Sequence, residues 1–233
     1  MQQIMDKITE RYYAGKSSHE GHSSKYLPAD EMRQLRVELD DIEAGVDRLQ
    51  PFFLSTWLHY NYALVKLYEP ATYLEDQPGD TSSFRGQCLL YCLQAAKSFF
   101  TTFLSFPAES LLYSPFVTFA ELVLAIATAS RVLLLEADGW SVEEARQTLN
   151  LSAVLIDIIT HFKAVDRLDK QWQTQHSMNA ENGSGTGVAN DVTVWEDYIE
   201  KLSFVRRWFE ARVGTSGHFA PMEAGSEEFP GEF

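Results

Sequence analysis

Apolar residues recur along this chain at alternating steps of three and four positions, the spacing that lines one face of an α-helix. The clearest stripes are Leu35, Leu39, Ile42, Val46 and Leu49; Phe53, Trp57, Tyr60, Leu64 and Leu67; Cys88, Cys92, Ala95, Phe99, Phe103 and Phe106; Leu151, Leu155, Ile158, Phe162 and Val165; and Trp195, Tyr198, Leu202, Val205 and Phe209. Residues 115–136 add a long helix that is apolar on most of its surface. The pattern predicts helices along most of the chain.

Signals at the expected helix ends agree with this prediction. The first stripe can begin near Asp30, and Ser141 with Glu144 forms a capping box at the start of another helix. We find no segment of strand length that alternates between apolar and polar residues. We therefore expect an all-α fold, a single domain of packed antiparallel helices with flexible loops and a disordered C-terminal tail.

Three polar segments interrupt the helical pattern, at residues 14–25, 176–191 and 214–233. The first two are rich in Gly, Ser and Asn and contain little that could be buried, which predicts flexible loops. The expected organisation is a flexible N-terminal segment over 1–27, an all-α domain over 28–212 with an internal flexible loop at 174–192, and an acidic disordered tail over 213–233.

The C-terminal tail differs from the other two segments in composition. It carries no Lys or Arg and combines acidic with aromatic residues: Glu223, Glu227, Glu228 and Glu232 with Phe219, Phe229 and Phe233. This combination is typical of disordered segments that activate transcription. A merely solvated tail is the simpler interpretation, and both stay open at this point.

Composition narrows the class of protein. The 233 residues, 45% of them hydrophobic, suffice for one domain with a sizeable core. With 19 Lys and Arg against 33 Asp and Glu, the net charge of −14 disfavours binding to bare nucleic acid or anionic lipid. Two cysteines and a charged N-terminus without an apolar segment predict an intracellular protein without a secretory signal. Glu121 and Arg131 interrupt the apolar stretch 111–135, so we expect a buried helix there and no membrane span.

No catalytic, cofactor-binding or metal-ligating set is expected. Cys88 and Cys92 are four positions apart on one helical face, too far for a disulfide within a helix, and we predict that both are packed in the core. The acidic stretches at 40–43 and 190–198 resemble those of terpene-cyclase-like enzymes, but only Asp40 and Glu43 of the first stretch could share a helix face. An all-α enzyme of this kind is the third-ranked hypothesis.

Four segments in a fixed order, within the stretch from residue 58 to about 165, resemble a known family. They are LHYNYALVKLYEPA (58–71), CLLYCLQAAKSFFTTFLSFP (88–107), FVTFAELVLAIATASRVLLL (116–135) and DGWSVEEARQTLNL (138–151). Together they resemble the C-terminal half of the regulatory region, the middle homology region, of fungal binuclear zinc-cluster transcription factors. The resemblance implies a helical regulatory domain that modulates transcription, acts through protein partners of the transcription machinery and in some members senses a small molecule.

The chain departs from that family in its DNA-binding part. Family members hold two zinc ions with a cluster of six cysteines, whereas this chain contains two cysteines. We therefore expect no zinc and no direct contact with nucleic acid. The expected compartment is the nucleus, with the cytoplasm as the alternative.

A small-molecule effector would need a pocket, and the long apolar helix offers one candidate. Thr118, Glu121, Ala125 and Thr128 share a narrow face of that helix. The pattern favours a thin solvent-exposed strip, and burial of Glu121 against a partner is the alternative. If this face lines a pocket, the candidate effector site comprises Phe103, Phe116, Glu121, Thr128 and Trp140.

We therefore expect a non-enzymatic intracellular regulator without a cofactor. The alternative is a stand-alone helical protein that binds a small molecule.

Overall fold

The computed structural model describes residues 2–14, 29–45, 53–73, 82–180 and 193–215. Within these residues 89% are helical and no strand occurs, so the chain is a single all-α domain, as the sequence predicts. The elements are α1 (Gln2–Ala14), α2 (Ala29–Gly45), α3 (Phe53–Tyr68), the short 3-10 helix η1 (Glu69–Thr72), α4 (Ser82–Leu104), α5 (Ala108–Leu111), α6 (Phe116–Leu134), α7 (Val142–Thr148), α8 (Leu151–Ala180) and α9 (Val194–Thr215).

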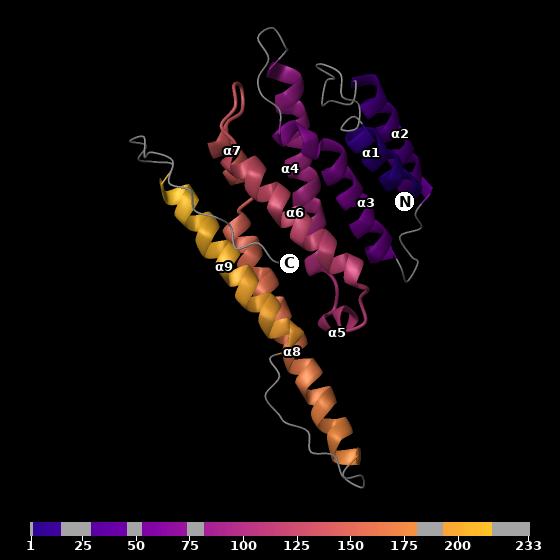
Figure 1. Ribbon diagram of the computed structural model, residues 1–233, viewed down its shortest axis with the longest axis vertical. Coiled ribbons are helices and arrows are strands. Elements are labelled where there is room, and N and C mark those ends of the chain that lie inside the picture. Colours follow the sequence, from indigo (N-terminus) through magenta and orange to yellow (C-terminus); the bar gives the residue numbers. More distant parts are fainter. Residues whose placement is uncertain (1, 15–28, 46–52, 74–81, 181–192, 216–233) are drawn as a thin grey trace.

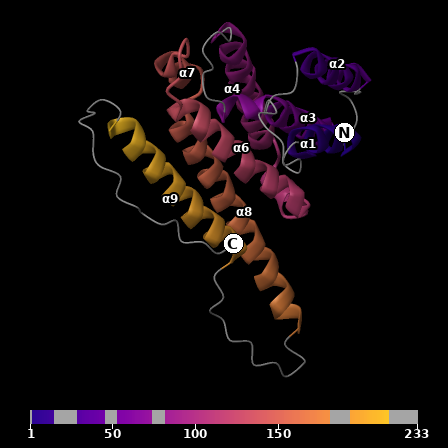
Figure 2. The same ribbon diagram turned by 45° about the horizontal axis from the view of Figure 1, so that its top comes forward.

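The long helices α3, α4, α6, α8 and α9 alternate in direction along the chain (Figure 1). Helices α3 and α4 pack against each other, α4 also contacts α6, and α8 pairs with α9. A tilted view shows α1, α2 and α3 grouped on one side of α4 and α6, with α8 and α9 on the other (Figure 2). The arrangement is therefore a bundle in which α4 and α6 are central.

An aromatic cluster lies where α4, α6, α8 and α9 meet. The ring of Phe162 on α8 lies 6.0 Å from Phe103, 6.1 Å from Phe119 and 5.7 Å from both Trp195 and Tyr198, measured between ring centroids. Phe103 and Phe162 are completely buried. Edge-to-face and tilted contacts of this kind add to the free energy gained by burying the rings, so the cluster joins the two sides of the bundle.

The start of α9 is held by a reciprocal capping box that faces α8. Thr193 Oγ1 accepts a hydrogen bond from the backbone N–H of Glu196 at 3.1 Å, and Glu196 Oε2 accepts one from the N–H of Thr193 at 3.1 Å. The same hydroxyl donates to Asp166 on α8 at 2.6 Å, while Lys170 bridges Asp166 and Glu196 at 2.7 Å each. Burial alone would raise the pKa of Asp166, but the hydrogen bonds from Lys170 and Thr193 outweigh it and lower that pKa.

The turn between α6 and α7 depends on its glycine and tryptophan. Gly139 has a φ of 73°, in the left-handed region that other residues adopt only under strain. The Nε1–H of Trp140 donates to the carbonyl of Val132 at 3.1 Å. Ser141 then caps α7 by accepting from the N–H of Glu144, which confirms the predicted N-terminus.

Three of the expected boundaries are wrong. The flexible segment over 1–27 is wrong for residues 2–14, which form α1, because Ile4 and Ile8 are one helical turn apart and both are buried. The flexible loop over 174–192 is wrong for residues 174–180, because α8 continues to Ala180. Likewise α9 extends to Thr215, so residues 213–215 of the expected tail are helical. Residues 15–28, 181–192 and 216–233 lie outside the described part of the chain, so their expected flexibility stays a prediction.

Among the described residues, α6 and the stretch 142–175 are long and apolar enough to cross a membrane. This is weak evidence for a span, because core helices of bundles have the same composition. In α6, 61% of the most apolar window is buried inside the bundle.

Candidate functional site

The polar face of α6 is packed against α3 and η1. Thr118, Glu121, Ala125 and Thr128 are all buried, at most 8% exposed. The solvent-exposed strip favoured by the sequence is therefore wrong, and the alternative of a buried carboxylate with a partner is confirmed. The reason is that α3 and η1 supply polar side chains for both Glu121 and Thr128.

His59 of α3 is the partner of Glu121. Its Nδ1 lies 2.9 Å from Oε1 and 2.8 Å from Oε2 of the carboxylate, so the ring is oriented toward α6. The hydrogen bond to Glu121 raises the pKa of His59, and burial opposes the rise. The pair therefore links α3 to α6 most strongly when the imidazole is protonated.

Glu69 forms a second polar contact two turns further along α6. Its carboxylate accepts hydrogen bonds from Tyr73 at 3.1 Å, Thr128 at 3.3 Å and Arg131 at 3.1 Å, and from Lys66. The guanidinium of Arg131 also lies 4.5 Å from the centre of the Tyr73 ring. Glu69 is only 7% exposed, and these partners compensate its burial. This arrangement joins η1 to α6 and has the character of a structural contact.

The structure does not bring the five candidate effector residues together. Phe103 is in the aromatic cluster. Glu121 contacts His59, and Thr128 donates a hydrogen bond to Glu69. Trp140 donates a hydrogen bond to a backbone carbonyl near the end of α6. Phe116 begins α6 and is 77% exposed. At about 1.5 Å per residue it lies ~18 Å along the helix from Thr128. Three of the five residues belong to α6 and Phe103 belongs to α4, and each of the buried ones is engaged by a different partner.

The two cysteines are buried, as predicted from their stripe. Cys88 is 3% exposed and Cys92 is fully buried, and neither is in a disulfide. The Sγ of Cys88 lies 3.7 Å from the sulfur of Met32 on α2. Burial raises the pKa of Cys88 to about 11 and raises that of Cys92 as well. Both are therefore thiols at neutral pH, which suits a packing role.

The acidic stretch at 40–43 is hydrogen-bonded by side chains of the same chain. The hydroxyl of Tyr60 donates to Asp40 at 3.1 Å and to Glu43 at 2.8 Å, and Arg36 donates to Asp40 at 2.7 Å. Burial and the hydrogen bond to Glu43 raise the pKa of Tyr60. In the part of the chain that the structure describes, no three His, Cys, Asp or Glu side chains gather in a way that could hold a metal ion.

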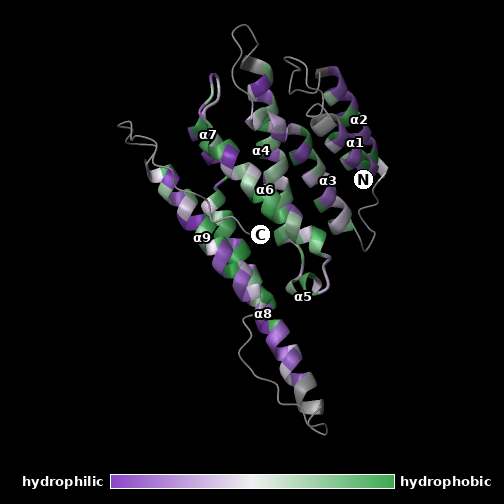
Figure 3. Ribbon diagram, in the orientation of Figure 1, coloured by the Kyte–Doolittle hydropathy of each residue, from purple (hydrophilic) through white to green (hydrophobic). Residues whose placement is uncertain are grey.

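A neighbouring face of α6 is apolar and exposed. Phe116 is 77% exposed, Val117 48%, Val123 51% and Leu124 44%. We call these four residues the outer face of α6. The hydropathy view shows α6 as an apolar band between the more polar α9 and α3 (Figure 3). A helix on the surface of a bundle normally presents polar residues outward, so this face is an exception to the rule.

A second surface feature is a groove at the end of α9. It has a volume of about 370 Å³ and lies between the α7–α8 turn and the last turns of α9. Its apolar wall includes Leu149, Leu151, Phe209 and Val213. The cation Arg146, the anion Glu210 and Gly214 also border it. We call it the α9 groove.

Sequence reasoning missed both surface features. The outer face had a signal, because residues 115–136 are apolar around most of the helix and one neighbouring side of a bundle cannot cover all of them. The α9 groove had none, because it forms between the 146–152 segment and residues more than 50 positions later.

Comparisons of the chain with protein-family models, curated proteins and solved structures find no match.

Proposed function

We propose that this chain is a transcription-factor-like regulatory domain without a DNA-binding zinc cluster, and that it modulates transcription by binding a protein partner through the outer face of α6. The observation that carries the proposal is the exposure of Phe116, Val117, Val123 and Leu124. The transcriptional context comes from the resemblance of residues 58–165, which span α3 to the first half of α8.

The chemistry of the outer face indicates the kind of partner. The nearest charged groups on α6 are paired with other parts of the bundle, since Glu121 binds His59 and Arg131 binds Glu69. A partner would therefore be recognised by apolar contact, as when an amphipathic helix lies along an apolar surface. Burying such a patch yields about 25 cal/mol for each Å² removed from water, and exposed patches of this kind commonly mark interaction sites.

The proposal includes no catalytic role and no cofactor. The buried carboxylates of Glu69 and Glu121 are bound to cationic or imidazole groups, and the cysteine thiols are buried with raised pKa values. The proposed partners belong to the transcription machinery or to a related regulator, and the proposed location is the nucleus. The alternative of a small-molecule-binding protein gains no support from the five candidate residues, because they are distributed over separate contacts.

A reporter assay tests the proposal. The full chain is fused to a foreign DNA-binding domain. Reporter expression is then compared between the unaltered chain and a double variant that carries Val123→Glu and Leu124→Glu. Two carboxylates in an apolar contact should weaken partner binding by about 1.4 kcal/mol or more, so we expect about a tenfold loss of the effect on transcription.

The control carries the same added charge outside α6, at Val37→Glu with Phe204→Glu, both on exposed side chains. Circular dichroism and the thermal midpoint should show that both double variants stay folded. An unaltered fusion that leaves the reporter unchanged overturns the proposal, and equal effects of the two double variants reject the outer face as the contact.

A further inference from the structure

We propose that the α9 groove is the docking site of this chain's own residues 216–233, with Phe219 as the anchoring side chain. This self-docking does not depend on the proposed role in transcription. If the self-docking and the role in transcription both hold, docking would withdraw the acidic and aromatic residues of the segment from a partner. The protein would then control how accessible this segment is.

The first observation is where the described chain ends. Val213 and Gly214 border the groove, and α9 ends at Thr215. The following segment therefore begins at the groove itself. Phe219 is four residues beyond the end of α9, and an extended chain covers about 3.3–3.6 Å per residue, so its side chain is within ~14 Å of the helix end. It is the first large apolar side chain that follows the helix.

The second observation is the character of the groove. The groove has an apolar wall formed by Leu149, Leu151 and Phe209. Their exposed fractions are 3%, 1% and 4%. The volume of about 370 Å³ is at the lower end of the range for ligand pockets, which suits one aromatic side chain and a short stretch of backbone. At Gly214 a Cβ atom would meet nothing within 4 Å, so this border of the groove is open. An apolar anchor can therefore enter without displacing the helices.

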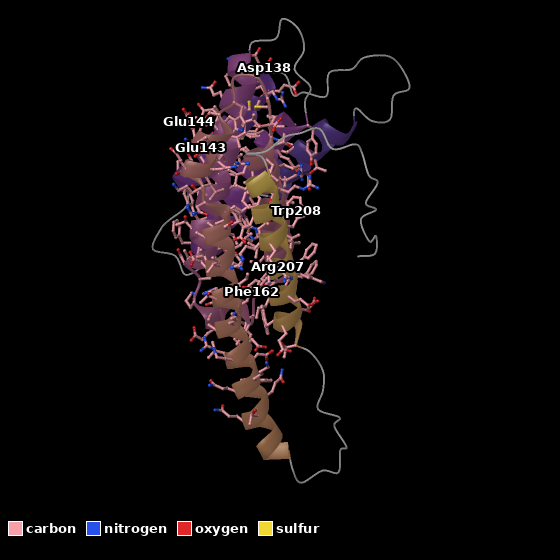
Figure 4. The ribbon with its side chains drawn as sticks, turned by 90° about the vertical axis from the view of Figure 1, so that its left-hand side faces the viewer. Asp138, Glu143, Glu144, Phe162, Arg207 and Trp208 are labelled. Atoms are coloured by element: carbon pink, nitrogen blue, oxygen red, sulfur yellow. The ribbon has the colours of Figure 1, made fainter. Side chains whose placement is uncertain are left out.

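The third observation is charge complementarity. Residues 216–233 contain four Glu and no Lys or Arg. Residues 201–212 of α9 contain four basic side chains and one acidic one, Glu210, in a chain whose net charge is −14. Arg146 adds a further cation at the groove. Figure 4 shows Arg207 and Trp208 on α9, apart from the acidic Glu143 and Glu144 of α7. The groove itself is lined by one cation, Arg146, and one anion, Glu210. The other charged side chains over residues 201–212 of α9 are basic, so the surroundings of the groove carry an excess of positive charge that an acidic segment would approach favourably.

Paramagnetic relaxation tests the proposal on the full chain. A nitroxide is attached at Met222→Cys, because Cys88 and Cys92 are buried and do not compete for the label under native conditions. We expect strong broadening of the amide signals of residues 149–152 relative to those of α2. In Phe219→Ser the equilibrium constant for docking should fall at least about tenfold, since burying one Phe side chain contributes roughly 1.5–3 kcal/mol.

Three further variants keep the test independent of folding defects. Gly214→Leu places a side chain in the open border of the groove and should displace the segment, whereas Gly45→Leu on α2, where a Cβ also meets nothing within 4 Å, should not. Phe229→Ser should leave the broadening in place. Broadening that is unchanged by both Phe219→Ser and Gly214→Leu overturns the proposal. So does broadening that depends on protein concentration, which would indicate a second copy, or broadening confined to the outer face of α6. None of these readouts involves transcription, so this test can fail while the proposed function stands.

Discussion

His59 Nδ1 lies within 2.9 Å of both carboxylate oxygens of Glu121, and the two residues are 62 positions apart in the sequence. The side chains are 27% and 10% exposed, so most of the contact is shielded from water. The Nδ1–H of the imidazole faces both carboxylate oxygens. The strength of the contact between α3 and α6 therefore depends on the charge of His59.

The first prediction concerns the pH dependence of this pair. The pKa of His59 is raised in the folded protein relative to its ordinary value of 6.5. The stabilisation is therefore fully present below about pH 6.5 and is lost as the pH rises through the folded pKa. Glu121→Gln should lower the free energy of unfolding by about 1–2 kcal/mol at pH 6 and by clearly less at pH 9.

Urea unfolding followed by circular dichroism at the two pH values measures this difference. Glu136→Gln, an exposed carboxylate just after α6, is the control and should show no such change between pH 6 and pH 9. A Glu121→Gln effect that is the same at both values would contradict the proposed ion pair.

The second prediction concerns the aromatic cluster. Phe162 is fully buried and contacts rings from three other helices, so Phe162→Ala leaves a cavity at the centre of the bundle. We expect the free energy of unfolding to fall by about 3–5 kcal/mol. Phe204→Ala removes an equally large ring that is 63% exposed on α9 and should change it by less than about 1 kcal/mol. Similar losses in the two variants would refute the described packing of α8.

The third prediction concerns Glu69. Glu69→Gln removes the charge that compensates Lys66 and Arg131 but keeps the shape of the side chain. Because the site is nearly buried, we expect a loss of about 2–4 kcal/mol in chemical unfolding. Glu109→Gln, on the exposed side of α5, serves as the comparison and should be close to neutral. A Glu69 variant as stable as this comparison would show that the contact contributes little.

The fourth prediction concerns the thiols. The pKa of Cys88 is raised to about 11 by burial, so both burial and protonation slow its reaction at pH 7.5. A thiol reagent under native conditions should label neither Cys88 nor Cys92 at the rate seen in urea. Mass spectrometry of the labelled protein over time gives both rates. Rapid native labelling of both residues would place them outside the core.

The helices of the bundle were predictable because their signal is local. Leu155, Ile158 and Phe162 recur at helical steps, and the structure buries all three. The same holds for Cys88 and Cys92, whose burial follows from their position in a stripe. The short helix α1 was missed because Ile4 and Ile8 form only a two-residue stripe, which is too short to separate from chance.

The contacts between helices were not predictable, because no local pattern encodes them. Glu121 on an apolar helix indicates either an exposed strip or a buried pair, and only the position of His59 decides between them. The positions of the candidate effector residues relative to one another were not predictable for a related reason. Phe116 is the first residue of α6 and Trp140 follows its last residue by six positions, so the 19 residues of the helix separate the two side chains.

The length of α8 has a consequence for its dynamics. Lys170 still contacts the start of α9, whereas residues 171–175 are exposed and the helix continues to Ala180 beyond the bundle (Figure 1). The packed half of α8 has already met the cost of nucleation, so the projecting turns only propagate an existing helix. Each of these turns can open and close by a local helix–coil step without disturbing the aromatic cluster. Amide hydrogens should therefore exchange progressively faster toward Ala180, because the free energy of local opening decreases turn by turn along the projecting end of α8.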